Sequence, residues 1–288
     1  MLLSGKARLA GVIGWPVGHS LSPRLHGHWL QRHGIDGAYL PLPVRPDDIE
    51  LAFRALPRLG FLGWNVTLPH KEAAFRLVDG HDPSALRTGV VNTVMVDADG
   101  RTRGYSTDGG GFLANLRAQA SGWRPQAGPA VLVGCGGAAR AVAVALLDAG
   151  VPELRLTNRT ADRALALKEV LERDFPAAAI ALLPWEARAA ALEGAALCVN
   201  TTSLGMKGQP PLDLDLSALP LASPVADLVY VPLETELLAA ARRRGHPVVD
   251  GLGMLLHQAV PGFAHWGGVT PEVDAAARGV LLEALQAR

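Results

Sequence analysis

Short apolar runs alternate with amphipathic stretches from one end of this chain to the other. In the first third, the runs that predict strands lie at residues 9–14, 38–42, 60–66 and 90–96. Helical periodicity is expected from Ser22 to Arg32, over residues 47–56, and in a short helix that begins near Lys71. Ser22 fits the N-cap of the first helix and Pro23 its first helical position. This alternation predicts an α/β fold.

The second half of the chain repeats the alternation with more strongly apolar strands. These strands are expected at residues 130–133, 153–157, 195–200, 225–227 and 247–249, and the helices between them at residues 138–149, 161–175 and 234–244. Apolar strands that are regularly followed by helices indicate a parallel sheet covered on both faces, the doubly wound pattern. One more helix is expected from about Met254 and another after Thr270-Pro271, with Thr270 as N-cap. Because the alternation has ended by then, we expect these two helices to return to the first domain.

A glycine-rich turn follows the strand at residues 130–133. It reads Gly134-Cys135-Gly136-Gly137-Ala138-Ala139-Arg140. A strand, a tight glycine turn and a helix make a dinucleotide-binding fingerprint, in which Gly134 allows the turn, Gly136 lets the backbone approach a pyrophosphate, and Ala139 permits close helix–strand packing. Methyltransferases and flavoproteins carry similar turns, so the turn alone leaves the cofactor open. The long segment before it is naturally interpreted as a substrate domain.

The end of the next strand favours NADP over NAD. An NAD enzyme usually has Asp or Glu about 20 residues beyond the glycines, where it accepts hydrogen bonds from the ribose hydroxyls. Here the strand ends in Asn158-Arg159-Thr160, without a carboxylate. A carboxylate would repel a 2′-phosphate, whereas a guanidinium can pair with it in fork geometry. The alternative interpretation is that Arg159 is a solvated residue at the start of a helix capped by Thr160.

Composition limits the possible partners and location. Lys+Arg and Asp+Glu both number 27 in 288 residues, which gives no electrostatic basis for binding nucleic acid or an anionic membrane. No apolar stretch of about 18 residues predicts a membrane span, and the N-terminus lacks the apolar segment of a signal peptide. The two cysteines, Cys135 and Cys198, form no CxxC pair and suggest a reducing compartment without a zinc framework. We therefore expect a cytoplasmic protein.

Three polar segments of the first domain are typical of a functional site. They read Gly18-His19-Ser20-Leu21-Ser22-Pro23, Asn65-Val66-Thr67-Leu68-Pro69-His70-Lys71, and Asn92 with the later Ser106-Thr107-Asp108-Gly109. The first places two hydroxyls at a helix N-terminus, which favours an anion, although simple capping by Ser22 would leave only Ser20 unexplained. The alternative interpretation of the second segment is a turn with a surface lysine. For the third segment, the alternative is that its Asn or Asp only forms a turn. Lys71 is one of only four lysines and, unlike arginine, can lose its proton.

Together these segments resemble the shikimate dehydrogenase family over essentially the whole chain. The other matching stretches are Val91-Asn92-Thr93, the Gly134–Arg140 turn, Asn158-Arg159-Thr160, residues 200–206, residues 227–230 and residues 250–259. The resemblance implies an N-terminal α/β domain for substrate binding and catalysis, residues 1–107 and 251–288, and a Rossmann-type, doubly wound NADP-binding domain, residues 108–250. It implies reversible, NADPH-dependent reduction of 3-dehydroshikimate to shikimate in aromatic amino-acid biosynthesis.

The resemblance also assigns roles to individual residues. At the substrate it implies Ser20, Ser22, Asn65, Thr67, Asn92, Tyr230 and Gln258, with Ser20, Ser22 and Tyr230 at the carboxylate. Lys71 would lie at the reacting oxygen beside Asp108, and the proton could belong to either residue or to the pair. At the cofactor it implies Gly134, Cys135, Gly136, Gly137 and Ala138 for the pyrophosphate, Asn158, Arg159 and Thr160 for the 2′-phosphate, and Thr202, Gly253 and Met254 beside the nicotinamide.

Two departures and one histidine-rich helix need separate interpretation. Ser106 stands where the family more often has Asn, which affects the shape of the substrate pocket. Cys135 replaces the usual Ala near a helix N-terminus, which can lower a thiol pKa, so a redox role and a small tolerated residue are both open. His26, His28 and His33 lack the spacing and carboxylate of a zinc helix, so no metal is expected.

Alternatives remain within and beyond this family. A quinate/shikimate dehydrogenase would prefer NAD, with an acidic residue near Asn158 and a larger carboxylate site, and an aminoshikimate-type relative is a further variant. A non-catalytic ligand sensor could dispense with Lys71, Asp108 or the glycine turn, all of which are intact. Substrate is expected between the two domains, with their closure as a hypothesis. Both a monomer and a homodimer remain open.

Overall fold

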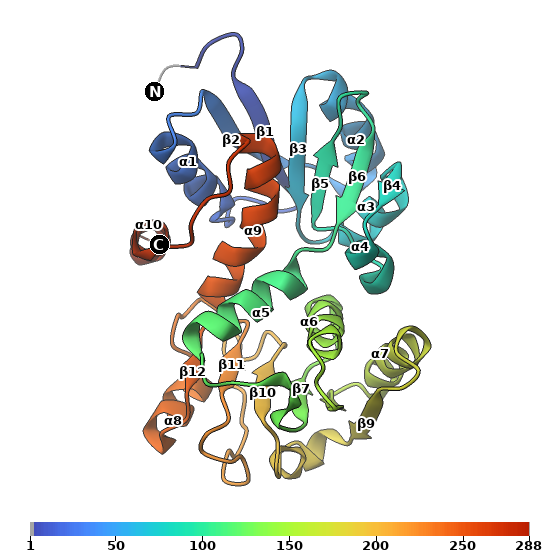
Figure 1. Cartoon of the computed structure of the whole chain (residues 1–288), viewed down its shortest axis with the longest axis vertical. Helices are drawn as coiled ribbons and strands as arrows, with labels where there is room; N and C mark the ends of the chain where they lie inside the picture. The colour runs from blue at the N-terminus through green and yellow to red at the C-terminus, as the bar shows by residue number, and fades with distance from the viewer. Residues whose placement is uncertain (1–2, 288) are drawn as a thin grey trace. The chain divides into compact units, whose positions relative to one another are not determined.

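A computed structural model describes residues 3–287 of the chain (Figure 1). By its contacts the chain divides into two compact units. Unit 1 contains the chain up to Thr107 together with the part from Gln258 onwards, and unit 2 runs from Asp108 to His257. Each unit has its own six-stranded sheet and its own core. The two are described separately below.

The sheet of unit 1 is mixed. Its strands are β1 (Arg8–Gly14), β2 (Gly37–Pro43), β3 (Phe61–Val66), β4 (Gly80–His81), β5 (Thr93–Val96) and β6 (Thr102–Tyr105), in the spatial order β2-β1-β3-β5-β6-β4. The β1 strand pairs in parallel with β2 and β3, whereas β5 is antiparallel to both β3 and β6. Central strands β1 and β3 are almost wholly buried, because helices cover the sheet.

The helices of unit 1 surround this sheet. They are α1 (Ser22–Arg32), α2 (Ile49–Arg58), α3 (Lys71–Leu77), α4 (Pro83–Thr88) and α10 (Ala275–Gln286), with the last part of α9 (Gly251–Gly267). Of these, α1, α2 and α4 contact the strands of the sheet directly. Helix α10 packs against α1, and Arg32 forms an ion pair with Asp274 just before α10. The C-terminal chain therefore returns to the first domain, as its position after the alternating segment predicts.

The sheet of unit 2 is entirely parallel. Its strands are β7 (Ala130–Val133), β8 (Glu153–Thr157), β9 (Ala179–Leu183), β10 (Leu197–Asn200), β11 (Val225–Asp227) and β12 (Val248–Val249), in the order β12-β11-β10-β7-β8-β9. Numbered along this unit, that order is 6-5-4-1-2-3, the Rossmann arrangement. The predicted doubly wound fold is therefore confirmed. Strand order reverses between β7 and β10, and ligands of such sheets bind beyond the carboxyl ends of the strands at this point.

Helices cover the sheet of unit 2 and close its apolar core. They are α5 (Asp108–Gln119), α6 (Gly137–Asp148), α7 (Ala161–Asp174) and α8 (Glu236–Arg244). Strand β7 is buried at every position, and the alanines on α6 let this helix lie close to its neighbours. The carbonyl of Ala141, for example, lies 2.5 Å from the place of a β-carbon on Gly109 in α5. Small residues thus bring α5 and α6 together.

Two expected helix starts were wrong. Ser22 is the first helical residue rather than the N-cap, which is Leu21, and Ser20 Oγ accepts the N–H of Ser22 at 3.2 Å. The hydroxyl that satisfies this helix end is therefore that of Ser20. At the other end of the chain, Thr270 starts no helix, since α10 is capped by Asp274, whose carboxylate accepts the N–H of Ala277 at 2.9 Å.

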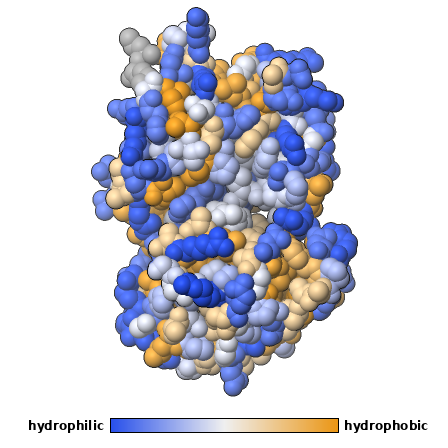
Figure 2. Space-filling model, viewed as in Figure 1, coloured by the Kyte–Doolittle hydropathy of each residue, from blue (hydrophilic) through white to orange (hydrophobic). Residues whose placement is uncertain are grey.

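The surface shows no broad segregation of residue types in the view of Figure 2, where hydrophilic and hydrophobic residues are interspersed. This distribution accords with the equal numbers of acidic and basic residues in the sequence. Within residues 3–287, no helix has the length and apolar character needed to cross a bilayer.

Candidate active site

In unit 1, two neighbouring strand ends bring two of the polar segments together. Strand β1 ends at Gly14 and β3 at Val66, and the loops beyond them lead to Ser20 and to Thr67. The N–H of Thr67 donates to the Ile13 carbonyl at 2.9 Å, and the N–H of Trp15 donates to the Leu68 carbonyl at 3.0 Å. These bonds hold the serine segment and the Thr67 segment side by side.

A buried network of side chains joins three of the predicted substrate residues. Asn65, Asn92 and Gln258 are all at most 8% exposed. The Asn65 amide nitrogen donates to the Asn92 carbonyl at 3.2 Å, and the Asn92 amide nitrogen donates to Gln258 Oε1 at 3.4 Å. Residues far apart in the sequence therefore form one polar cluster in unit 1.

Three further members of this network were given no individual role from the sequence, namely Tyr39, Thr93 and Thr107, although Thr93 and Thr107 lie in segments identified there. The Asn92 amide nitrogen donates to Thr107 Oγ1 at 3.0 Å, and the Thr107 N–H donates to Asn92 Oδ1 at 2.8 Å. The Tyr39 hydroxyl donates to Asn65 Oδ1 at 2.6 Å. The sequence holds one signal for Tyr39: a tyrosine within an apolar strand needs a partner for its hydroxyl when it is buried.

Lys71 lies at the first position of α3, beside this network. Its carbonyl accepts the N–H of Val91 at 3.0 Å, which ties the start of α3 to the residue before Asn92. The neighbouring His70 is buried, and its Nε2 lies 2.8 Å from the Val44 carbonyl, so this side chain anchors the segment. Asp108 belongs to unit 2, as the first residue of α5. The pairing of Lys71 with Asp108 stays a prediction.

In unit 2, the glycine-rich turn lies at the switch point between β7 and β10. Gly134 has a φ of 107°, and a β-carbon there would lie 2.6 Å from Thr202 Cγ2. Thr201 Oγ1 donates to the Gly134 carbonyl at 2.8 Å. Both the backbone conformation and this close approach require glycine at position 134. Gly136 and Gly137, in contrast, are exposed at the start of α6.

The segment after β8 meets the same turn. Asn158 Oδ1 accepts the N–H of Cys135 at 3.1 Å, and the Asn158 amide nitrogen donates to the Thr160 carbonyl at 2.7 Å. Asn158 therefore holds the turn with its side chain. Arg159 is exposed. Thr160 is the N-cap of α7, but its side-chain oxygen accepts no capping hydrogen bond from the described residues.

Asn200 and Asp227, at the ends of β10 and β11, fix the loops that carry Thr202 and Tyr230. Asn200 Oδ1 accepts from the N–H and the hydroxyl of Thr202, at 3.0 and 2.7 Å, while its amide nitrogen donates to Asp227 Oδ1 at 3.0 Å. Asp227 in turn accepts from the N–H of Val229 at 2.9 Å. Burial raises the pKa of the Asp227 carboxyl, and its hydrogen bonds, the strongest from Thr235, act in the opposite direction.

Gly253 owes its identity to packing within unit 2. A β-carbon at this position would lie 1.7 Å from Asn115 Oδ1 on α5, so any larger residue would displace that side chain. The Asn115 amide nitrogen donates to the Asp250 carbonyl at 2.7 Å. Met254, the next residue, packs against the core of the unit. Asn115 thus holds the start of α9, which carries Gly253 and Met254, two of the three predicted nicotinamide-side residues.

The chain resembles known proteins over nearly its whole length. Residues 12–94 match the family model described as the shikimate dehydrogenase substrate binding domain. The shikimate dehydrogenase (NADP(+)) of Paramagnetospirillum magneticum is 59% identical over 280 residues, which are 97% of this chain and 100% of the relative. The chain belongs to the shikimate dehydrogenase family.

Solved structures of shikimate dehydrogenase relatives share the complete fold. A quinate dehydrogenase from Corynebacterium glutamicum in complex with NAD has a TM-score of 0.89 at 33% identity, over 96% of this chain and 99% of that one. The shikimate 5-dehydrogenase from Thermus thermophilus, in complex with NADP(H) and shikimate, has a TM-score of 0.82 at 36% identity, over 97% and 99%. The solved relatives therefore include a quinate dehydrogenase in complex with NAD and a shikimate dehydrogenase in complex with NADP(H), the two main alternatives that the sequence leaves open.

The pKa of the cysteine in the glycine turn bears on the two interpretations left open by the sequence. Burial raises the pKa of the Cys135 thiol to about 12, in the direction opposite to the lowering that a helix N-terminus can cause. A thiol held in its protonated form is a poor nucleophile, which favours the interpretation of a small tolerated residue in this shikimate dehydrogenase relative. Among the described residues, no group of three or more His, Cys, Asp or Glu side chains could hold a metal ion.

Proposed function

We propose that this protein catalyses the reversible, NADPH-dependent reduction of 3-dehydroshikimate to shikimate in aromatic amino-acid biosynthesis. The observation that carries the proposal is the buried cluster of Asn65, Asn92 and Gln258 beside the helix that begins with Lys71. Amide side chains both donate and accept hydrogen bonds, so such a cluster suits a small ring with several hydroxyl groups.

Substrate recognition divides between the ring and its carboxylate. Asn65, Thr67, Asn92 and Gln258 are proposed to bind or support the ring, together with Asp108. Ser20 and Ser22 at the start of α1, with Tyr230, are proposed to bind the carboxylate. The N-terminus of a helix favours an anion, which supports the serine pair in this role.

The proton step is assigned to Lys71. Reduction of a carbonyl requires a proton at its oxygen, and oxidation of the alcohol requires its removal. Lys71 Nζ is proposed to give this proton in one direction and to take it in the other, with Asp108 as its partner. Because such a pair can titrate as a unit, the proposal concerns the pair rather than one residue.

The glycine turn and its neighbours fit an NADP molecule. Apart from its chain neighbours, no described heavy atom lies within 4 Å of a β-carbon placed on Gly136 or Gly137, so the start of α6 is open to a ligand. Its N–H groups and dipole would face the pyrophosphate, Arg159 and Thr160 would face the 2′-phosphate, and Thr202 and Met254 would lie beside the nicotinamide. NADPH, when bound, supplies the two reducing electrons.

We further propose that residues 108–250 form the NADP-binding domain and that residues 1–107 with 251–288 form the substrate-binding and catalytic domain. A cytoplasmic location is proposed because both cysteines are free thiols rather than a disulfide. The working protein is proposed to be a monomer or a homodimer, which the mass of the purified enzyme in solution would decide.

Initial rates of cofactor reduction test this function. The purified protein is given shikimate or quinate, each with NADP or NAD. We expect the highest kcat/KM for shikimate with NADP, because Arg159 is exposed and no carboxylate lies within residues 158–160. Equal or higher kcat/KM for quinate with NAD would favour the specificity of the Corynebacterium relative. Absence of turnover with all four pairs would contradict an enzymatic role.

A further inference from the structure

Tyr39 occupies a buried position in β2, the edge strand of the unit 1 sheet. It is 7% exposed, whereas Leu40 next to it is 39% exposed, so the strand turns the tyrosine inward. Tyr39 pairs with Ala10 of β1 in the parallel register, and β1 lies between Tyr39 and the β3 strand that carries Asn65. Its ring therefore crosses beneath the central strand toward the polar cluster.

The hydroxyl of Tyr39 contacts one predicted substrate residue on another strand. It donates to Asn65 Oδ1 at 2.6 Å. Burial raises the pKa of Tyr39 well above its usual value, and the Ser22 side chain lowers it by less. The phenol therefore keeps its proton and remains a donor to Asn65.

This donation fixes which way the Asn65 amide faces. With Oδ1 accepting from Tyr39, the amide nitrogen points to the Asn92 carbonyl at 3.2 Å and to Thr93 Oγ1 at 3.0 Å. In the flipped orientation, Asn65 Oδ1 would face the Asn92 carbonyl, with two acceptors in contact. Tyr39 thus determines the donor side of Asn65 and, through it, the place of Asn92.

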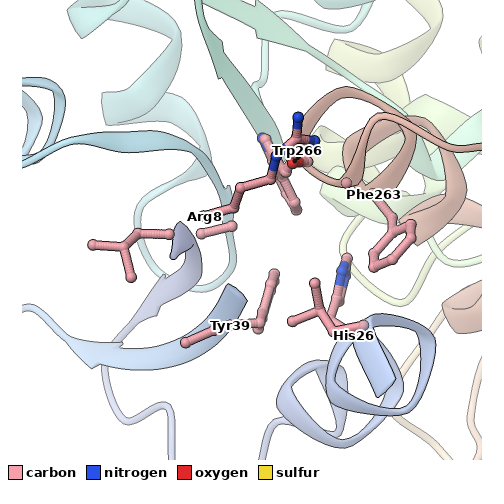
Figure 3. Close-up of a pocket in the computed structure, with 10 residues that line it drawn as sticks. Arg8, His26, Tyr39, Phe263 and Trp266 are labelled. Carbon is pink, nitrogen blue, oxygen red and sulfur yellow. Dashed lines mark hydrogen bonds between the residues drawn. The ribbon is translucent and has the colours of Figure 1, made fainter. Parts of the chain in front are cut away.

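The ring of Tyr39 is held from behind by aromatic side chains (Figure 3). His26 stacks on it with ring centroids 3.9 Å apart and an angle of 6° between the planes, and Trp266 lies 5.8 Å away. The cavity that these residues line has a volume of about 10 Å³, enough for a single water molecule. A ring confined in this way keeps its hydroxyl in one place.

We propose that Tyr39 is a positioning residue for the substrate, which acts by orienting Asn65 without contacting the substrate itself. The proposal rests on the proposed function, since it assumes that Asn65 faces the substrate. The network would then extend from the aromatic layer of His26 and Trp266, through the tyrosine hydroxyl, to the part of the site that binds the substrate ring.

The substitution Tyr39→Phe tests the proposal, because it removes only the hydroxyl and keeps the stacked ring. We expect the KM for shikimate to rise about two- to tenfold, which is the usual worth of one neutral hydrogen bond. The KM for NADP and kcat should stay within about twofold of the wild type. The control is Thr102→Val, which removes another buried hydroxyl of unit 1, bonded to Asp79 Oδ2 at 2.8 Å and outside the network.

The outcomes separate positioning from a general loss of structure. If Tyr39→Phe and Thr102→Val lower the unfolding midpoint and only Tyr39→Phe raises the KM for shikimate, positioning is supported. Equal KM values in both variants and the wild type would overturn it. A rise of both KM values for Tyr39→Phe would also overturn it, since a disturbed fold would affect cofactor and substrate alike.

A double-mutant cycle with Asn65→Ala gives the second measurement. If Tyr39 acts mainly through Asn65, adding Tyr39→Phe to Asn65→Ala should change the KM for shikimate less than adding it to the wild type. Full additivity would contradict the route through Asn65. A wild-type protein without shikimate turnover would refute the proposed function, whereas an active wild type with an unaffected Tyr39→Phe variant would refute only the positioning role.

Discussion

The two sheets of this protein keep their buried polar groups in different places. In unit 1, side chains such as Tyr39, Asn65 and Asn92 bond to one another beneath and between the strands. In unit 2, the central strands β7, β10 and β11 are apolar except at their ends, where Asn200 and Asp227 hold loops. Under the proposed function, the first sheet would present side chains to its ligand, and the second would present backbone.

This difference follows from what each proposed ligand requires. A small ring with several hydroxyls is distinguished by donors and acceptors at defined positions, which side chains supply. A pyrophosphate is bound by backbone N–H groups at a helix start. Such a site requires small residues, because side chains would block access to the backbone. We therefore expect ligand binding by unit 1 to weaken when a polar side-chain group is removed. Ligand binding by unit 2 should weaken when a β-carbon is added to a glycine of the turn.

The largest effect is expected for Lys71→Ala. Removal of a general acid–base group usually lowers the rate of the chemical step by about 10²–10⁴-fold. We expect kcat for shikimate oxidation to fall by this factor with little change in either KM. Steady-state kinetics at saturating substrate and NADP measure it, and a variant with near-normal kcat would exclude Lys71 from proton transfer.

Two glycine substitutions in unit 2 form a matched pair. Gly134→Ala forces a side chain into a φ of 107° and against Thr202, so we expect a loss of stability of about 1–3 kcal/mol. Gly136→Ala meets no described atom within 4 Å, apart from its chain neighbours, so the free energy of unfolding should stay unchanged while the KM for NADP rises. Urea unfolding and NADP kinetics on both variants check this. A stable Gly134→Ala, or a Gly136→Ala with unchanged KM for NADP, would undermine the role given to the turn.

His26, a buried histidine of unit 1, predicts a dependence of stability on pH. Burial lowers the pKa of His26 from 6.5 to about 3. Between these two pH values the unfolded chain binds a proton that the folded chain does not, so this group's contribution to stability falls as the pH drops below 6.5. The slope is at most about 1.4 kcal/mol per pH unit.

Urea unfolding of the wild type and of His26→Phe, measured from pH 7.5 downward, tests this dependence. The phenylalanine keeps an aromatic ring against Tyr39 but cannot take up a proton. We expect the variant to lose less stability than the wild type as the pH falls. Parallel curves for the two proteins would show that His26 does not titrate as proposed.

The sequence predicted unit 2 better than unit 1, for a physical reason. The central strands of unit 2 are buried and apolar, so the runs at 130–133 and 225–227 coincide with β7 and β11. Strand β9 was missed although it is apolar, because a short alanine-rich run does not distinguish a strand from a helix. In unit 1, β4 and β6 were missed because they are short and have no apolar run. Thr270-Pro271 had the pattern of a helix start, but the carboxylate of Asp274 capped the helix instead.

The candidate site shows a similar limit. The motifs identified Asn65, Asn92 and Gln258, and the structure brings these three together in unit 1. Tyr39 was not identified, because its link to Asn65 depends on the register of β2, β1 and β3 rather than on a local pattern. Likewise, Asn158 holds the glycine turn through contacts that only the parallel pairing of β7 and β8 creates.

The division of recognition between side chains of unit 1 and the turn of unit 2 is tested most directly by calorimetric titration of two variants with two ligands. We expect Gln258→Ala to weaken shikimate binding about tenfold and leave NADP binding unchanged. Arg159→Ala should weaken NADP binding about 10- to 100-fold, since it removes a charged partner of the 2′-phosphate, and should leave shikimate binding unchanged. If each variant weakened the binding of shikimate and of NADP to the same extent, the division of recognition between the two units would be contradicted.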